Sequence, residues 1–137
     1  MTTLGREAIT TVDLIVAQGA DQSYAVRYST SDGTTTTPVD LTDWSARAQL
    51  RRKVGGDIWL DLTDTDGIAL TADGLVTVTI DHTTTEDPAW NAYSRVTSDG
   101  PQTLGVWDLE LISPDGRVTR LVQGTVTVSP DVTRSQA

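Results

Sequence analysis

The densest group of acidic side chains contains Asp61, Asp64 and Asp66, directly before Gly67. Calcium prefers several oxygen ligands, and an Asp-x-Asp-Gly sequence is typical of part of a calcium-binding loop. However, the chain has no glutamate where the twelfth position of such a loop would fall. Turn chemistry explains the same residues, because Asp and Gly both tolerate left-handed backbone geometry. We interpret the group as a turn and keep calcium binding as the alternative.

The single histidine, His82, lacks the sequence partners that catalysis or metal binding would require. The chain has no cysteine, no second histidine and no Gly-x-Ser-x-Gly nucleophile motif. We therefore expect His82 to be a capping or surface residue. Asp108 and Glu110 have the residue types of a glycosidase pair, but their spacing places both on one solvated strand face. The only lysine, Lys53, does not follow a glycine-rich phosphate loop. The sequence predicts no catalytic residue, no cofactor and no metal.

The aromatic residues fall into two groups. Trp44 and Trp107 share the phase of neighbouring aliphatic residues, so we expect them in the core. Trp59, Trp90 and Tyr93 are out of phase. They fit a second hydrophobic cluster, anchors of a subunit interface, or a platform for stacking sugars. The candidate interface residues are Trp59, Trp90, Tyr93 and, in the C-terminal tail, Arg134.

The elements that would position these residues are β-strands. Within Val106–Pro130, apolar and polar residues alternate on both sides of the turn Ser113–Gly116, which predicts a β-hairpin at the centre of a sheet. Further strands are expected at Val12–Ala17, Ser23–Ser29, Asp40–Lys53, Asp57–Leu62, Ile68–Leu70 and Leu75–Ile80.

Four details of this pattern can be checked against a structure. Val12–Ala17 is apolar at consecutive positions, so we expect burial on both faces. In Asp57–Leu62 the aliphatic residues should face inward and Trp59 outward. Thr30–Pro38 is expected to be a loop, as is Ser94–Thr103. Thr83, with Glu86 three residues later, resembles a capping box for one or two helical turns.

Short strands joined by Gly/Asp turns predict an all-β protein. We expect an antiparallel immunoglobulin-like β-sandwich of about seven to nine strands with one short helical segment. Residues 1–11 would form an N-terminal arm, 12–130 the sandwich and 131–137 a C-terminal tail.

Composition narrows the class of partner. The 137 residues carry a formal charge of −9, so the surface repels nucleic-acid phosphates. No apolar run of membrane-spanning length is present, and the N-terminus lacks the features of a secretory signal. We expect no nucleic-acid partner, no membrane partner and synthesis in a cytoplasm.

Three segments of the chain resemble a known group of proteins. They are Val39–Arg51, Leu60–Thr63 and Gly105–Arg134, the last with Trp-Asp-Leu-Glu-Leu, a Pro-Asp-Gly turn and a Gly-Thr-Val-Thr-Val exit. Their order resembles small structural proteins of tailed bacteriophages, in particular β-sandwich modules associated with the tail or baseplate.

This resemblance implies a non-enzymatic virion protein that sits on the tail, neck or baseplate. It further implies assembly through strand edges and termini, several copies per particle, and other phage structural proteins as partners. A capsid decoration protein is one alternative. A carbohydrate-binding module for host attachment is the other.

Overall fold

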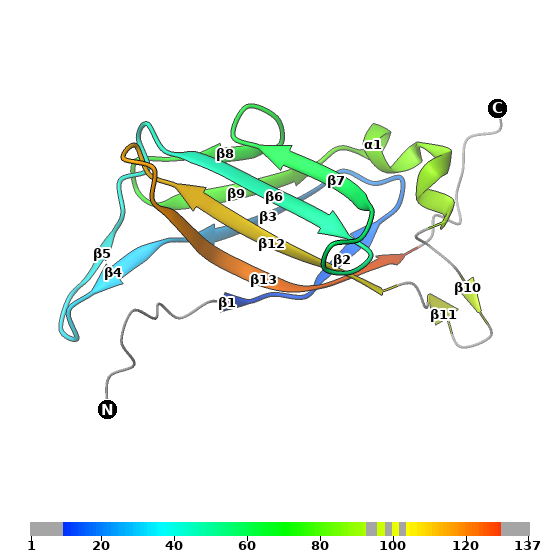
Figure 1. Ribbon diagram of the computed structural model, residues 1–137, viewed down its shortest axis with the longest axis horizontal. Coiled ribbons are helices and arrows are strands. Elements are labelled where there is room, and N and C mark those ends of the chain that lie inside the picture. The colour runs from blue at the N-terminus through cyan, green and yellow to red at the C-terminus, as the bar shows by residue number, and fades with distance from the viewer. Residues whose placement is uncertain (1–9, 93–95, 98–99, 102–103, 130–137) are drawn as a thin grey trace.

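The structure, a computed structural model, describes residues 10–92, 96–97, 100–101 and 104–129. Two β-sheets lie on one another as layers (Figure 1). In the part of the chain described there are thirteen strands, and seven of them are at least four residues long. The expected all-β fold with a short helix is confirmed, whereas its immunoglobulin-like character stays a prediction.

The first layer, called the large sheet, is built around the expected hairpin. Its strand order is β1 (Thr10–Thr11), β13 (Val118–Ser129), β12 (Leu104–Ile112), β6 (Ser45–Arg51) and β7 (Ile58–Thr63), with β2 (Leu14–Ala17) also paired to β13. The hairpin strands β12 and β13 therefore lie inside the sheet, as the alternating pattern predicts.

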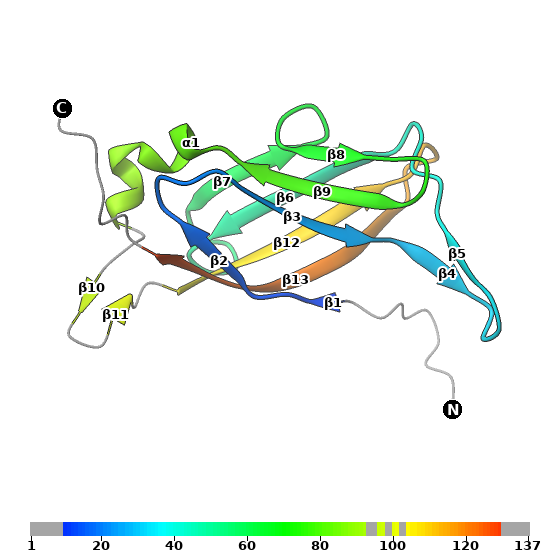
Figure 2. The same ribbon diagram turned by 180° about the vertical axis from the view of Figure 1, so that it is seen from behind.

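The second layer, called the small sheet, contains β3 (Gln22–Arg27), β9 (Leu75–Ile80) and β8 (Ile68–Leu70) in that order. Figure 2 shows these strands crossing in front of β12 and β13. After β9 come α1 (His82–Glu86) and a 3₁₀ helix (Pro88–Ala92) at one end of the sandwich. No helix among the described residues is long and apolar enough to cross a membrane.

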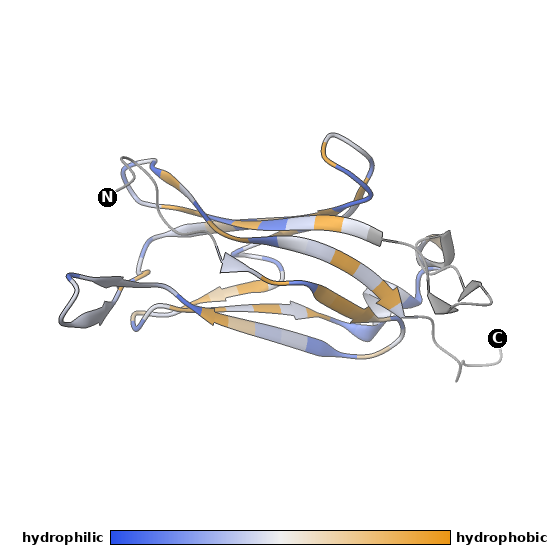
Figure 3. Cartoon of the chain, turned by 90° about the horizontal axis from the view of Figure 1, so that it is seen from below, coloured by the Kyte–Doolittle hydropathy of each residue, from blue (hydrophilic) through white to orange (hydrophobic). Residues whose placement is uncertain are grey.

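The core lies between the two layers, because each strand buries alternate side chains. Figure 3 shows the corresponding alternation of hydrophobic and hydrophilic bands along the strands. The fully buried large side chains come from both sheets and from the segment before β6: Leu14, Val16, Leu41, Leu50, Val76, Ile80, Leu109, Leu111, Val122, Val126 and Val128. The expected core positions Trp107, Leu109 and Leu111 are confirmed.

The edge of the large sheet departs from the antiparallel expectation. Both β1 and β2 run parallel to β13. Only Leu14 and Val16 of β2 are buried, while Ile15 is 66 % exposed, so the predicted burial on both faces is wrong. The reason is that no other layer covers the outer face of the large sheet, on which Ile15 lies. Residues 10 and 11, assigned to the N-terminal arm, belong to this sheet.

Two β-bulges change the phase of strands, and sequence periodicity missed both. In β13 the register shifts beside Leu109 and Glu110, which leaves Leu121 as the extra residue. Val118 then points outward with 60 % exposure, although Val122, Val126 and Val128 face the core.

The second bulge lies between β6 and β7. Leu50 pairs with Leu60 and Arg51 pairs with Ile58, so Trp59 is the extra residue. The prediction that Ile58 faces inward and Trp59 outward is therefore wrong. Ile58 is 45 % exposed, and Trp59 is buried.

The segment expected to be a loop at residues 30–38 is instead a hairpin of β4 (Ser29–Ser31) and β5 (Thr36–Pro38). It projects beyond the sandwich in Figure 1. The second expected loop contains the short strands β10 (Val96–Thr97) and β11 (Gly100–Pro101), which pair with one another. Helix α1 is capped by Asp81 rather than by Thr83, because the Asp81 side chain accepts a hydrogen bond from the Thr83 amide.

Candidate functional site

The outer face of the large sheet carries a shallow depression of about 400 Å³. It is positioned by four neighbouring strands, β1, β13, β12 and β6, and by the turn between β6 and β7. Its lining includes Gln49, Arg51, Val54, Asp108 and Arg120. Because the side chains of β6 and β12 alternate, the buried Ala48, Leu50 and Leu109 hold the opposite face of the same strands in the core.

Charged side chains on this face lie next to one another on adjacent strands. The pairing of β13, β12 and β6 aligns Arg120, Glu110 and Arg47. Arg120 lies 3.6 Å from an oxygen of Asp108 and 4.0 Å from an oxygen of Glu110. Asp108 and Glu110 therefore share one arginine on the outer face of β12. Their spacing in the sequence predicts this common strand face.

Arg51 is held close to the sheet beside the depression. Its guanidinium donates to the Gln49 side-chain oxygen at 2.8 Å and to the Gly56 carbonyl at 2.7 Å. The next residues, Arg52 and Lys53, are exposed, and Val54 is 90 % exposed. The depression therefore combines cationic side chains with an uncovered aliphatic one.

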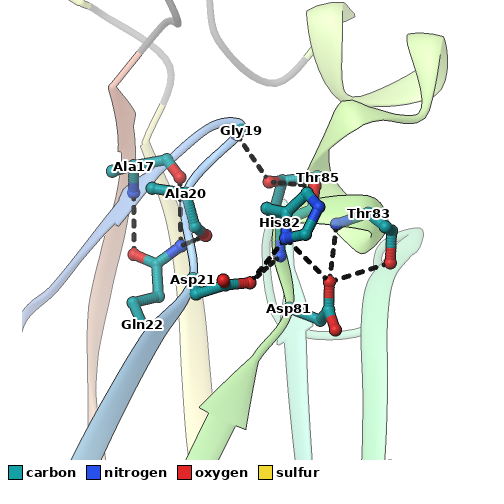
Figure 4. A network of polar contacts seen from close by, with 9 residues as sticks. All are labelled: Ala17, Gly19, Ala20, Asp21, Gln22, Asp81, His82, Thr83 and Thr85. Carbon is teal, nitrogen blue, oxygen red and sulfur yellow. Dashed lines mark hydrogen bonds and ion pairs between the residues drawn. The ribbon is translucent and has the colours of Figure 1, made fainter.

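A second polar constellation joins the turn after β2 to the start of α1 (Figure 4). His82 donates its backbone N–H to an Asp21 carboxylate oxygen, and its ring Nδ1 lies 2.7 Å from the same oxygen. Nδ1 also lies 3.3 Å from Asp81. An ionised carboxylate only accepts hydrogen bonds, so Nδ1 carries the proton in this arrangement.

The pKa values of these three groups follow from the contacts. The hydrogen bond and charge of Asp21 raise the pKa of His82, with further contributions from Asp81 and Glu86. The His82 backbone amide, followed by its ring, lowers the pKa of Asp21. Hydrogen bonds from the Thr83 amide and hydroxyl lower the pKa of Asp81. The arrangement thus favours an imidazolium between two carboxylates.

Buried polar contacts beside this group extend the link between the two turns. The Thr85 hydroxyl is fully buried and accepts a hydrogen bond of 2.8 Å from the Gly19 amide. Gln22 bonds both the amide and the carbonyl of Ala17 and also the carbonyl of Ala20. We interpret the network as a clamp that holds the β2–β3 turn against α1.

Among the described residues, Asp21, Asp81 and His82 form the group of potential metal ligands, with one atom from each within 4.8 Å of the others. These residue types suit a divalent cation. However, the same Asp21 and Asp81 oxygens accept the hydrogen bonds that fix the two turns. The expectation that His82 is a capping or surface residue fits this position at the first turn of α1, where its side chain is 45 % exposed.

The acidic group Asp61, Asp64 and Asp66 is spread over a strand and the following turn. Asp61 lies on β7, and Asp64 accepts a hydrogen bond of 3.0 Å from the Ala46 amide. The Asp66 amide donates to the Thr63 carbonyl, which closes the turn before Gly67, whose φ is 99°. These contacts are those of a structural turn.

Trp59 and Trp90, the two candidate interface aromatics among the described residues, do not form an accessible platform. Trp59 and Trp90 are only 7 % and 4 % exposed, so burial in a hydrophobic cluster fits them, and their candidate role at an interface is corrected to one in the core. The Trp59 ring fits because Gly105 lies opposite, where an added Cβ would be 2.6 Å from the ring. Trp44, expected in the core, is half-buried and meets the Tyr28 ring edge-on at 6.1 Å. Tyr93 and Arg134 lie outside the described residues.

Sequence reasoning found His82 but missed Asp21, because sixty-one positions separate the two residues. The available signals were the Asp81 position before the helix and the polar Gln-Gly-Ala-Asp turn. Neither signal indicates that the turn after β2 lies beside the start of α1.

Comparison with known proteins adds no assignment. No protein-family model matches the chain, and no curated protein matches it either. The assignment to phage structural proteins accordingly remains a prediction from the sequence of Val39–Arg51, Leu60–Thr63 and Gly105–Arg134.

Proposed function

We propose that this chain is a non-enzymatic structural protein of a tailed-bacteriophage virion. It would act as a β-sandwich module on the tail, neck or baseplate, with other phage structural proteins as partners. The resemblance of Val39–Arg51, Leu60–Thr63 and Gly105–Arg134 to such modules suggests this class.

The projecting β4–β5 hairpin is the structural observation that supports the proposal most. All its residues from Thr30 to Pro38 are exposed, and its two strands pair only with one another among the described elements. A hairpin outside the core contributes little burial to folding. Its unpaired strand edges can instead pair with a strand of a neighbouring subunit.

The carbohydrate-binding alternative loses its main support, because the rings of Trp59 and Trp90 are buried. Glycan-stacking sites need an aromatic face that a sugar can reach.

The test is to image the intact particle and locate this two-layer sandwich in the density. Density at the tail, neck or baseplate supports the proposal. Density on the head lattice would identify a decoration protein, and absence from purified particles would overturn a virion role altogether.

A hairpin variant sharpens the test. Because Thr30 pairs with Thr37, and Pro38 lacks the N–H that would close a tight turn, residues 31–36 can be replaced by an Asn-Gly turn. We expect the melting temperature of the isolated protein to stay unchanged and its incorporation into particles to fall. The matched control, Thr34→Ser with Thr35→Ser, keeps the hairpin and should incorporate normally. Normal incorporation of the shortened variant would argue against an assembly role for the hairpin.

A further inference from the structure

Charge is divided unequally between the two layers of the sandwich. The large-sheet segments 10–17, 45–63 and 104–129 contain six basic and six acidic residues. Segments 18–44 and 64–92 contain one basic and ten acidic residues, and they form the small sheet, the β4–β5 hairpin, α1, the 3₁₀ helix and the turns between them. The second set, called the acidic layer, therefore carries a formal charge equal to that of the whole chain, −9.

The exposed large apolar side chains belong to the same large-sheet segments as most of the cations. Among the described residues the exposed large hydrophobic side chains are Ile15, Val54, Ile58 and Val118. Val54 lies in the turn after β6, and the other three point outward from strands of the large sheet. Arginine and uncovered apolar groups together are typical of protein-binding surfaces.

The basic face is defined here as Arg51, Arg52, Lys53 and Val54, at the end of β6 and in the turn after it, beside the depression of about 400 Å³. Elsewhere on this outer side, Arg47 and Arg120 are accompanied by Asp61, Asp108 and Glu110, which strand pairing places on the same face. Arg120 is partly neutralised by Asp108 and Glu110. Arg52 and Lys53 have exposed side chains beside Val54. An acidic partner surface would supply carboxylates to these cations while covering the valine.

We propose that the basic face binds the acidic layer of a second copy of this chain, in a front-to-back contact. Charge complementarity favours this arrangement, because the acidic layer repels a second acidic layer but is attracted by the cations of the basic face. The contact uses different surfaces on the two copies, so it can repeat into a ring or a stack. This inference goes beyond the proposed virion role and does not depend on it.

A recess lies where the acidic layer borders the large sheet, and Leu60 and Leu62 of β7 line one side of it. A depression of about 430 Å³ is lined by Asp64, Asp66 and Asp81 together with Thr65 and Thr84. Asp66 and Glu86 are exposed, and neither side chain makes a hydrogen bond among the contacts described above. Changing these two side chains therefore removes no hydrogen bond from the turns, while Glu86 contributes charge to the raised pKa of His82.

The test measures the sedimentation of the full chain at rising protein concentration. At about 20 mM salt the Debye length is long, and we expect the wild-type protein to associate; at about 500 mM salt it should return to the monomer. A wild-type protein that is monomeric under both conditions would overturn the proposal.

Two charge-reversed variants then locate the two surfaces. Arg52→Glu with Lys53→Glu reverses two cations of the basic face, and Asp66→Lys with Glu86→Lys reverses two carboxylates of the acidic layer. We expect each variant alone to associate at least about tenfold more weakly than the wild type. Mixed in equal amounts, they should form a complex that stops at two chains, since each variant retains the surface that the other lacks.

Charge-matched controls separate the position of a charge from its number. Arg27→Glu with Arg117→Glu, and Asp57→Lys with Asp61→Lys, change the net charge by the same amounts as the two test variants and should still associate. If the controls lose association as well, net charge rather than the proposed contact is responsible. An acidic-layer variant that associates like the wild type would indicate a face-to-face dimer and also contradict the proposal. Particle incorporation tests the virion role separately.

Discussion

Trp59 shows how one inserted residue changes the role of a side chain. Strict alternation would place it on the surface, where it could anchor a partner or stack on a sugar. The bulge opposite Leu50 and Arg51 turns the ring inward instead, and Gly105 leaves room for it. Its function is therefore packing between strands of the large sheet, and this role makes a clear prediction about stability.

We expect Trp59→Ala to lower the free energy of unfolding by about 3–5 kcal/mol, because a large buried ring leaves a cavity. Urea unfolding followed by far-UV circular dichroism measures this loss. Val54→Ala is the control in the adjoining turn. Since Val54 is 90 % exposed, its change should stay within about 0.5 kcal/mol. Similar small effects for both variants would place Trp59 outside the core.

His82 predicts a pH dependence whose sign follows from its contacts. Its pKa is raised in the folded protein, mainly by Asp21, so the contact contributes stability below the unfolded pKa of about 6.5. That contribution disappears as the pH rises through the higher folded pKa. The difference in unfolding free energy between wild type and His82→Gln should therefore be larger at pH 5.5 than at pH 8.5.

The measurement is urea unfolding of both proteins at the two pH values. Asp21→Asn provides the control, because in that background the His82 substitution should lose most of its pH dependence. If the difference in unfolding free energy between wild type and His82→Gln is the same at both pH values, the contact of His82 with Asp21 does not stabilise the protein through its charge.

The edge strand β1–β2 is the element whose position is least evident from local patterns. It is held to the large sheet by backbone pairing with β13 and by two side chains, Trp107 of β12 and its own Asp13. The Trp107 indole donates to the Val12 carbonyl at 2.7 Å, and Asp13 accepts from both the amide and the hydroxyl of Thr125. The strands approach most closely at Gly124, where an added Cβ would lie 2.0 Å from the Val12 oxygen.

We expect Gly124→Ala to destabilise the protein by about 1–3 kcal/mol, because the edge strand must move away from β13. Hydrogen exchange should accelerate first at the amides of β1 and β2, which lose their pairing. Thr127→Ala, on the same strand and paired with Ile15, is the control and should leave this exchange unchanged. Unchanged exchange in the glycine variant would contradict the close approach.

At the scale of the whole molecule, many aspartates act as hydrogen-bond acceptors for the turns. Hydrogen bonds from backbone amides or hydroxyls lower the pKa values of a set of exposed carboxyls: Asp13, Asp21, Asp32, Asp40, Asp73, Asp81 and Asp115. The acidic composition therefore contributes to turn geometry as well as to surface charge.

Because these folded pKa values lie below the unfolded value of about 3.8, the carboxylates contribute stability above that pH. The contribution is lost as the pH falls through the folded values. We expect the free energy of unfolding to decrease steeply below about pH 4, as measured by urea unfolding between pH 5 and 2.5. Asp32→Asn with Asp40→Asn should reduce the steepness, and an unchanged slope would count against this explanation.

The sequence by itself determined the local structure of the chain. Alternation predicted the central hairpin of β12 and β13 and the buried positions Trp107, Leu109 and Leu111. Proline, glycine and aspartate predicted its turn, and Gly116 has the positive φ of 89° that such a turn uses. These features depend on neighbouring residues, so they can be read from a short stretch of sequence.

Only the tertiary structure decided how these pieces meet. The parallel edge strands and the contact of Asp21 with His82 join residues that are distant in sequence. The two bulges depend on the register in which neighbouring strands pair. The division of charge between the layers also appears only when strands are assigned to sheets. A period of two specifies that a strand has two faces, but its pairing partner and register determine which face is buried and what lies beside it.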